Sequence, residues 1–210
     1  MEKPIEEIKI DEVTVKFYQD TDAQSPADWG DENLFLVHYH RDFWQENKDV
    51  TERDLRDLYQ GNKTETTRRL QKEYYIFPVA ALIHSGVWLK LGHGGFSMDE
   101  GGWDTSHVGA LFASKKEFKS KGDAEKCATG KVTEWNHYLS GDVYGFVVED
   151  KDGEDLDSCW GFYGLKYAKE EGLSMAKYHS DELQKKKAEK VKAFIKNKVS
   201  LDKREKALTK

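Results

Sequence analysis

The sequence predicts an α+β fold: a mainly antiparallel sheet of about five to seven strands, two or three packed helices, and a basic amphipathic helix at the C-terminus. Segments of strand and helix periodicity follow one another in blocks, which favours antiparallel pairing over parallel crossovers. An Asp-Gly pair between two apolar runs is a strong hairpin signal. The 210 residues include 6 Trp, 10 Tyr and 10 Phe, which is enough apolar surface for a core.

The first part of the chain predicts two strands and then two short helices. Residues 13–17 alternate apolar and polar side chains, and residues 34–40 form a second, more buried strand pattern. The turn formers of residues 19–26 separate these strands. Residues 51–54 resemble a capping box that starts a helix, and a second, polar helix is expected over residues 65–73.

The middle of the chain predicts strands around a glycine-rich loop. Residues 74–83 are the most apolar stretch and predict a central strand, in which Pro78 indicates a bulge or an edge. Residues 86–110 contain seven glycines, so we expect a long, shaped loop after Leu91. Residues 108–113 predict a further strand.

A helix, a hairpin and a last helix complete the predicted fold. Gly141 is expected to end the first of these helices, and Ser180 to be the N-cap of the last one. Residues 143–148 and 158–163 flank Asp152-Gly153 as the two strands of the hairpin. One face of the first helix carries apolar residues, namely Ala124, Cys127, Ala128, Val132, Trp135 and Leu139.

Charge divides the chain into an acidic body and a basic tail. Residues 183–210 hold 11 basic and 3 acidic side chains, within a chain whose net charge is -6. We therefore expect a core domain over residues 1–170 and a lysine-rich helical segment over residues 171–210. No apolar run approaches the ~20 residues of a membrane helix, and the N-terminus lacks an apolar leader region. With only 2 Cys there is no disulfide framework, so we expect a reducing, intracellular setting without membrane contact.

Three residues would form a nucleophilic site if the fold brought them together: Cys159 as the thiol, His84 as the base and Asp104 as the orienting acceptor. Cys159 stands in a predicted strand between apolar neighbours, where a buried, unreactive thiol is the common outcome. A cysteine-dependent hydrolase or transferase is therefore the alternative, and a non-catalytic protein is the leading hypothesis.

Histidines give a weak metal signal. His38 and His40 lie two apart on a predicted strand and point to one face, which is compatible with zinc or iron. Two solvated imidazoles explain this spacing equally well, and we favour that interpretation and expect neither a metal nor a cofactor. The other candidate ligands are His93 and His107, which flank the glycine-rich segment, and Asp42, Asp99 and Asp104.

The glycine-rich segment is the main candidate binding surface. Its loop glycines can present backbone N–H groups to an anion, but no Gly-Lys-Ser/Thr follows, so it is not a Walker loop. The tryptophans of the segment can supply rigid contact area or stack on bases. The alternative is that the glycines only allow tight packing around Trp88 and Trp103. The predicted ligand-binding residues are His84, Trp88, His93, Gly94, Gly95, Trp103 and Asp104.

The basic tail is the second candidate surface. A lysine-rich amphipathic helix can bind nucleic acid, a membrane surface or an acidic partner. A docked helix with a solvated lysine face is the simpler interpretation, and we favour it. Because the charges are nearly all Lys, any nucleic-acid contact is expected to be nonspecific. The tail residues expected to make it are Lys185, Lys186, Lys187 and Lys190.

Five short motifs follow one another between about residues 10 and 165. They are Asp-Thr-Asp-Ala-Gln-Ser-Pro-Ala-Asp-Trp at residues 20–29, Ile83-His84-Ser85-Gly86, Trp103-Asp104-Thr105-Ser106-His107-Val108-Gly109, Gly141-Asp142-Val143-Tyr144-Gly145-Phe146, and Asp157-Ser158-Cys159-Trp160-Gly161-Phe162-Tyr163-Gly164. In these motifs the chain resembles a family of small uncharacterised proteins encoded by tailed bacteriophages and prophages. Family members often have Tyr-Asp-His-Ser-Gly and Trp-Asp-Ser-Gly-Gln, where this chain has Ile83 and Thr105-Ser106-His107.

The resemblance implies a viral protein made in the cytoplasm of an infected bacterial host, and it implies no particular reaction. If the family's Asp at the position of Ile83 assists a catalytic His or binds a metal, this chain lacks that function. The replacement therefore makes an enzyme a less favoured interpretation. Small phage accessory proteins frequently act by stoichiometric binding, often against host defence. We therefore expect an accessory protein that binds a host protein or a nucleotide-type ligand and inhibits a host defence system. The alternatives are the cysteine-dependent enzyme and a nonspecific nucleic-acid-binding module that uses the tail.

Overall fold

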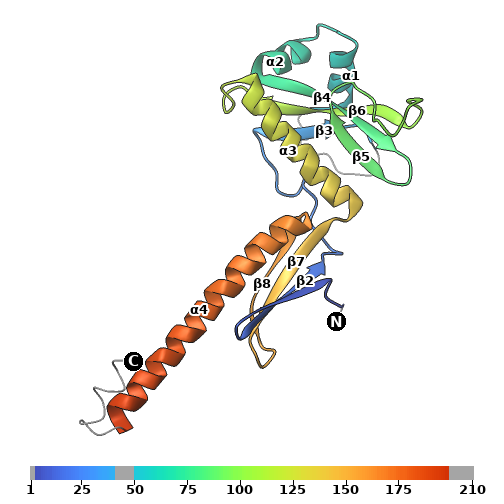
Figure 1. Ribbon diagram of the computed structural model, residues 1–210. Coiled ribbons are helices and arrows are strands. Elements are labelled where there is room, and N and C mark those ends of the chain that lie inside the picture. Colours follow the sequence, from blue (N-terminus) through green and yellow to red (C-terminus); the bar gives the residue numbers. More distant parts are fainter. Residues whose placement is uncertain (1–2, 41–49, 199–210) are drawn as a thin grey trace. The chain divides into compact units, whose positions relative to one another are not determined.

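The computed structural model describes residues 3–40 and 50–198 and has the α+β class that the sequence predicts (Figure 1). In these residues it contains eight strands and four helices, and the strands pair in antiparallel fashion. The strands form two four-stranded sheets instead of one. Each sheet belongs to its own compact unit, unit 1 with residues 1–20 and 144–210 and unit 2 with residues 21–143.

Unit 1 contains a sheet in the order β1-β2-β7-β8 and one long helix. Its elements are β1 (Glu6–Ile10), β2 (Val13–Gln19), β7 (Val143–Glu149), β8 (Asp155–Tyr163) and α4 (Leu165–Lys198). The predicted hairpin is confirmed as β7 and β8, whereas β1 is an additional strand. β2 pairs with β7 across more than a hundred residues of sequence, with Phe17 opposite Phe146.

Helix α4 begins at Leu165, so the prediction of a helix start at Ser180 is wrong. Ser180 lies buried within the helix, and its hydroxyl donates a hydrogen bond of 2.8 Å to the carboxylate of Asp11 in the β1–β2 turn. A serine followed by acidic residues resembles an N-cap in the sequence. Here the serine hydroxyl bonds a residue far away in the sequence instead of the backbone of its own helix. The domain boundary expected at residue 170 falls inside this helix.

The core of unit 1 lies between α4 and one face of its sheet. The small helix residues Ala168 and Ala176 are buried against Val15 and Phe17 of β2, so the helix backbone approaches the strands closely. In the described part of the chain, α4 included, no helix combines the length and the apolar character needed to cross a membrane.

Unit 2 contains a sheet in the order β3-β6-β4-β5 with helices on both faces (Figure 1). Its elements are β3 (Leu34–His38), α1 (Glu52–Tyr59), α2 (Glu65–Glu73), β4 (Tyr74–Ile83), β5 (Val87–Leu91), β6 (Thr105–Ser114) and α3 (Lys121–Ser140). The predicted strands and helices of this region are confirmed. The capping box at Thr51 and Asp54 is formed as expected, and Gly141 ends α3.

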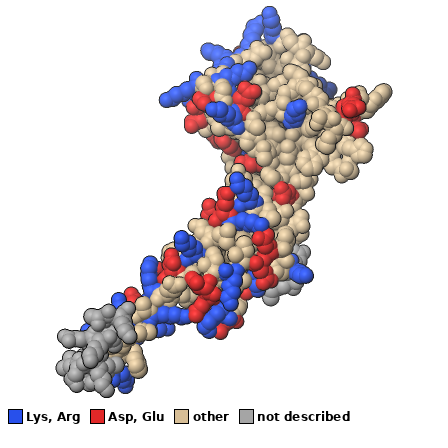
Figure 2. Space-filling model, viewed as in Figure 1, with Lys and Arg blue, Asp and Glu red and all other residues tan. Residues whose placement is uncertain are grey.

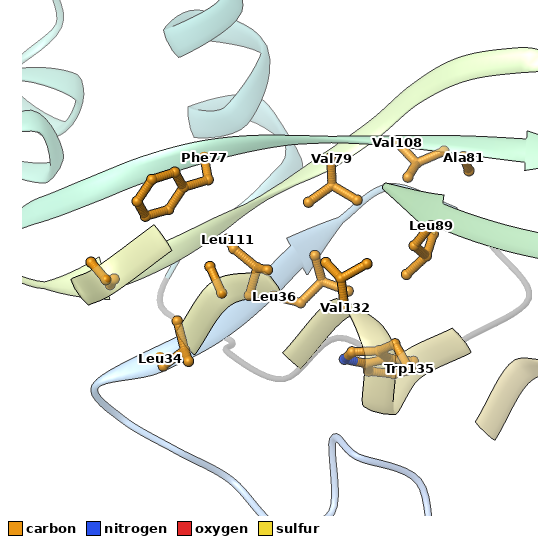
Figure 3. Packing of buried hydrophobic residues seen from close by; sticks show 13 residues of the cluster. Leu34, Leu36, Phe77, Val79, Ala81, Leu89, Val108, Leu111, Val132 and Trp135 are labelled. Atoms are coloured by element: carbon orange, nitrogen blue, oxygen red, sulfur yellow. The ribbon is translucent and has the colours of Figure 1, made fainter. Parts of the chain in front are cut away.

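Helix α3 packs on one face of this sheet and provides the larger core of unit 2 (Figure 3). Val132 and Trp135 of the helix point toward Leu36 and Leu89 of the strands. Cys127, which the sequence places on the apolar face of the helix, is exposed instead. On the opposite face, Leu55 of α1 and Leu70 of α2 cover Ala110 and Phe112 of β6.

The prediction of an irregularity near Pro78 is confirmed. The pairing of β4 with β6 shifts register between Val79 and Ala80, next to the proline. β5 pairs only with Val79–Ile83, so residues 74–78 of β4 have no β5 residue opposite them. Pro78 is therefore the last residue of the part of β4 that lacks a neighbouring strand on the β5 side.

Candidate functional site

The helices α1 and α2 cover only one half of their face of the unit 2 sheet. They pack on the half that contains Ile76, Ala110 and Phe112. On the other half, Leu82 of β4 stands directly between Trp88 of β5 and Thr105 of β6. Directly opposed residues in a sheet share a face, so these three side chains form one row across the strands. This half of the face forms the floor of the candidate site.

A β-bulge turns His107 toward this floor. In β6, Gly109 opposes Val79 and His107 opposes Ala80, so Val108 is the extra residue of the bulge. Val108 belongs to the α3-side core. In a regular strand the side chains of residues 107 and 109 would point to the same face, which here is the α3 side. The extra residue in the bulge turns the His107 side chain to the opposite face. His107 therefore shares a row with Ala80 and Lys90, next to the Trp88 row.

The loop of residues 92–104 is fastened near its start to β4 and β5. The backbone N–H of Gly92 donates to the carbonyl of Pro78 at 2.7 Å. The ammonium of Lys90 donates to the carbonyl of Gly95 at 3.0 Å and lies 5.9 Å from the centre of the Phe96 ring. Because Lys90 lies on the floor, these contacts bring the loop over it.

Asp99 fixes the second half of this loop. Its carboxylate accepts hydrogen bonds from the backbone N–H groups of Trp103 and Asp104 and, at 2.7 Å, from the hydroxyl of Thr105. The Thr105 hydrogen bond and these backbone N–H groups lower the pKa of Asp99. Gly102 has a φ of 67°, a left-handed conformation that glycine adopts without strain. The loop is thus a defined turn that presents Trp103.

Four large apolar side chains are exposed at this end of unit 2, and we call them the aromatic surface: Ile83, Trp88, Met98 and Trp103. Trp103 is 91% exposed, Met98 76% and Trp88 44%. The backbone N–H of Ile83 donates to the carbonyl of Asp104 at 2.9 Å, and Leu82 opposes both Trp88 and Thr105, so the segments that carry Ile83, Trp88 and Trp103 lie side by side at this end of the sheet.

Charge is distributed unevenly over unit 2. On the face that Figure 2 shows, the Lys and Arg side chains of unit 2 gather mostly over α2 and the start of α3, whereas the side that carries the β4–β5 hairpin is mostly uncharged. The carboxylates beside Trp103 are those of Asp99, Glu100 and Asp104. A partner that binds here meets apolar groups rimmed by negative charge.

Two histidines meet between the loop and β6, and we call them the histidine pair. Nδ1 of His93 lies 3.1 Å from Nε2 of His107, and the ring centres are 4.7 Å apart. Burial lowers the pKa of His107, and the nearby His93 lowers it further, against a smaller opposite effect of the Val79 backbone. Nδ1 of His107 is buried and makes no hydrogen bond of good geometry with any described residue.

Two tyrosines surround the histidine pair. The hydroxyl of Tyr39 donates to the carbonyl of His107, and that of Tyr59 donates to the carbonyl of Gly109. Burial raises the pKa of both phenols, that of Tyr59 strongly. The Tyr59 ring lies 5.8 Å from the His107 ring, centre to centre. Both tyrosines are therefore neutral hydrogen-bond donors at neutral pH.

A cavity of about 450 Å³ adjoins the histidine pair. Tyr59 and His93 line it together with Pro78, Ala110 and Lys121. The volume lies within the usual range for small-molecule sites. Its remaining lining residues are Leu55, Leu58, Gln71, Tyr74, Tyr75 and Ile76.

The structure gathers all the predicted ligand-binding residues in unit 2. The backbone N–H of Ile83 donates to the carbonyl of Asp104, and His84 follows Ile83 in the chain. The side chains of His84 and Asp104 are both exposed. Gly94 and Gly95 are exposed in the loop, and the carbonyl of Gly95 is used by Lys90.

The proposed nucleophilic set is divided between the two units. Cys159 lies on β8 in unit 1, whereas His84 and Asp104 belong to unit 2. The prediction that Cys159 is buried is wrong, because this residue of β8 is exposed. No single unit therefore contains a cysteine-histidine-aspartate site made of these residues.

The interpretation of His38 and His40 as two solvated imidazoles is wrong for His38. This residue ends β3 and is buried, and its Nδ1 accepts a hydrogen bond of 3.2 Å from the backbone N–H of His40. Asp42 lies outside the described residues. Within the part of the chain that the structure describes, no three or more His, Cys, Asp or Glu side chains form a group able to hold a metal ion.

The described part of the basic tail is the second half of α4. Lys187 pairs with Glu12 of the β1–β2 turn, and Lys185 pairs with Glu182 of its own helix. Lys186 and Lys190 are exposed. Beyond these contacts the apolar stripe is uncovered, since Phe194 is 63% exposed. The interpretation of a docked helix thus describes the segment up to Lys187.

Comparisons of the chain with protein-family models, with curated proteins and with solved structures found no match.

Proposed function

We propose that this chain is a phage accessory protein that acts by stoichiometric binding in the infected bacterial cell. It binds a host protein through the aromatic surface and thereby inhibits a host defence system. The single observation that carries the binding surface is the joint exposure of Trp88 on β5 and of Trp103 on the fastened loop. The phage context is taken from the motif resemblance.

Exposed indoles on a defined loop favour binding for an energetic reason. Clustered apolar side chains in contact with water gain free energy when a partner covers them, and Trp residues dominate many protein interfaces. Asp99 and Lys90 already hold the loop in place, so little conformational entropy is lost on binding. The same loop shows no paired acid and base that would favour catalysis over binding.

A protein partner is favoured over a nucleotide-type ligand by charge. Asp99, Glu100 and Asp104 stand beside Trp103 and would repel phosphate groups. The nearest lysine on the floor, Lys90, donates to the Gly95 carbonyl. A host protein with an apolar patch bordered by basic residues fits this surface better.

Native mass spectrometry of the chain purified from bacterial cells tests the proposal. The matched variants are the double substitution W88S/W103S and the control Trp29→Ser, which removes another exposed indole of unit 2. We expect the wild type and W29S to retain the same host protein in a fixed ratio, and the double variant to lose it. Retention of that protein by W88S/W103S, or a wild type without any retained protein, contradicts the proposal.

A further inference from the structure

One ring nitrogen of each histidine in the histidine pair lies at a distance compatible with two ligands on one metal ion. Zinc binds imidazole nitrogens at about 2.0–2.1 Å in a tetrahedral arrangement, which places two such nitrogens about 3.3 Å apart. Nδ1 of His93 and Nε2 of His107 are 3.1 Å apart. A displacement of a few tenths of an ångström, small for a loop residue, satisfies both bonds.

The positions of the two residues support this pairing. His107 is directed to this face only because Val108 forms a bulge in β6, and bulges often re-aim functional side chains. His93 follows Gly92, which is fastened to Pro78, so the loop delivers its ring to the same point.

We propose that Nδ1 of His93 and Nε2 of His107 together bind one divalent transition-metal ion, such as Zn²⁺, with water completing its coordination. The described residues contribute only these two ligands, so the site binds metal more weakly than a four-ligand structural site. His93 also lines the cavity of about 450 Å³, so the water positions are open to exchange. The bound ion ties the loop of residues 92–104 to β6.

Isothermal titration of the untagged, metal-free full chain with ZnCl₂ tests this site. We expect one ion per chain, and a dissociation constant at least tenfold higher in His93→Ala and in His107→Ala. The matched control is His179→Ala, which removes an imidazole of unit 1 that pairs with Asp157, and we expect it to bind like the wild type. Zn²⁺ should also raise the melting temperature of the wild type but not that of H93A.

Two outcomes overturn the proposal: the wild type takes up no Zn²⁺, or H93A binds it as tightly as the wild type. In either case the two rings share a hydrogen bond and no metal. Because His93 is exposed, we expect H93A to fold like the wild type, and near-ultraviolet circular dichroism checks this. The result is independent of the proposed function, because the partner test uses Trp88 and Trp103 and leaves both histidines unchanged.

Discussion

Substitution of Gly109 by alanine should open the contact between β3 and β6. A Cβ atom at this position would lie 2.2 Å from the carbonyl oxygen of Val37 and 2.8 Å from Cα of His38. Carbon–oxygen contacts between neighbouring strands are about 3.3 Å, so β3 would have to move by about 1 Å. Both obstructing atoms are backbone atoms in the interior of the sheet, so no side-chain rotation relieves the clash.

The expected loss of stability follows from the bonds that this shift weakens. Overpacking of an interior position costs about 1–3 kcal/mol, and each weakened ladder hydrogen bond adds about 1 kcal/mol. We therefore expect Gly109→Ala to lose about 3 kcal/mol of unfolding free energy. With a urea dependence of about 1.5 kcal/mol per molar, the unfolding midpoint of unit 2 falls by about 2 M.

The matched control is Gly95→Ala, because a Cβ atom there meets nothing within 4 Å. We expect its free energy of unfolding to differ from that of the wild type by less than about 0.5 kcal/mol. Urea unfolding followed by tryptophan fluorescence and circular dichroism measures both variants. Equal midpoints for G109A and G95A would refute the packing described between β3 and β6.

Three further predictions concern single side chains. Asp99→Ala should speed hydrogen exchange at the Trp103 amide about tenfold. Because the pKa of Asp99 lies below its ordinary value, the wild type keeps this protection at neutral and mildly acidic pH and loses it as the carboxylate is protonated, whereas a pH-independent difference would contradict the assigned role. Ser180→Ala should lower the unfolding free energy by about 1 kcal/mol, since it removes a part-buried hydrogen bond to the Asp11 carboxylate, and an unchanged urea midpoint would show that this bond contributes nothing. Cys159 should react with iodoacetamide in the folded protein, as peptide mass mapping can show, and a reaction that requires denaturant would contradict its exposed position.

Local patterns in the sequence predict most of the elements. The capping box at Thr51 and the hairpin signal Asp152-Gly153 act through neighbouring backbone groups, so they can be read without knowledge of the fold. The period-two and helical patterns likewise report which face of an element is buried. The glycine- and tryptophan-rich segment was identifiable for the same reason, since its composition alone departs from that of a packed element.

The features that sequence reasoning missed depend on distant partners. The pairing of β2 with β7 divides the strands into two sheets, and no local pattern encodes it. The exposure of Cys159 depends on what covers β8, and the burial of Ser180 depends on the β1–β2 turn. The bulge at Val108 reverses the side to which His107 points.

Tyr59 is a site residue with no signal in the sequence. It ends a short helix, and only the tertiary fold places its hydroxyl on the Gly109 carbonyl. The histidine pair is different, because His93 and His107 visibly flank the glycine-rich segment. Their meeting could have been inferred once β5 and β6 were both assigned as neighbours of β4.

The most direct test of the account is phage plating on bacterial strains that each carry one defence system and express this chain. We expect the chain to restore plating at least tenfold in a strain whose defence protein it binds, and we expect W29S to do the same. The double variant W88S/W103S should give no restoration at equal protein level, because its binding surface is removed. Full restoration by the double variant, or no restoration by the wild type in any strain of the panel, would contradict the claim that the aromatic surface performs the function.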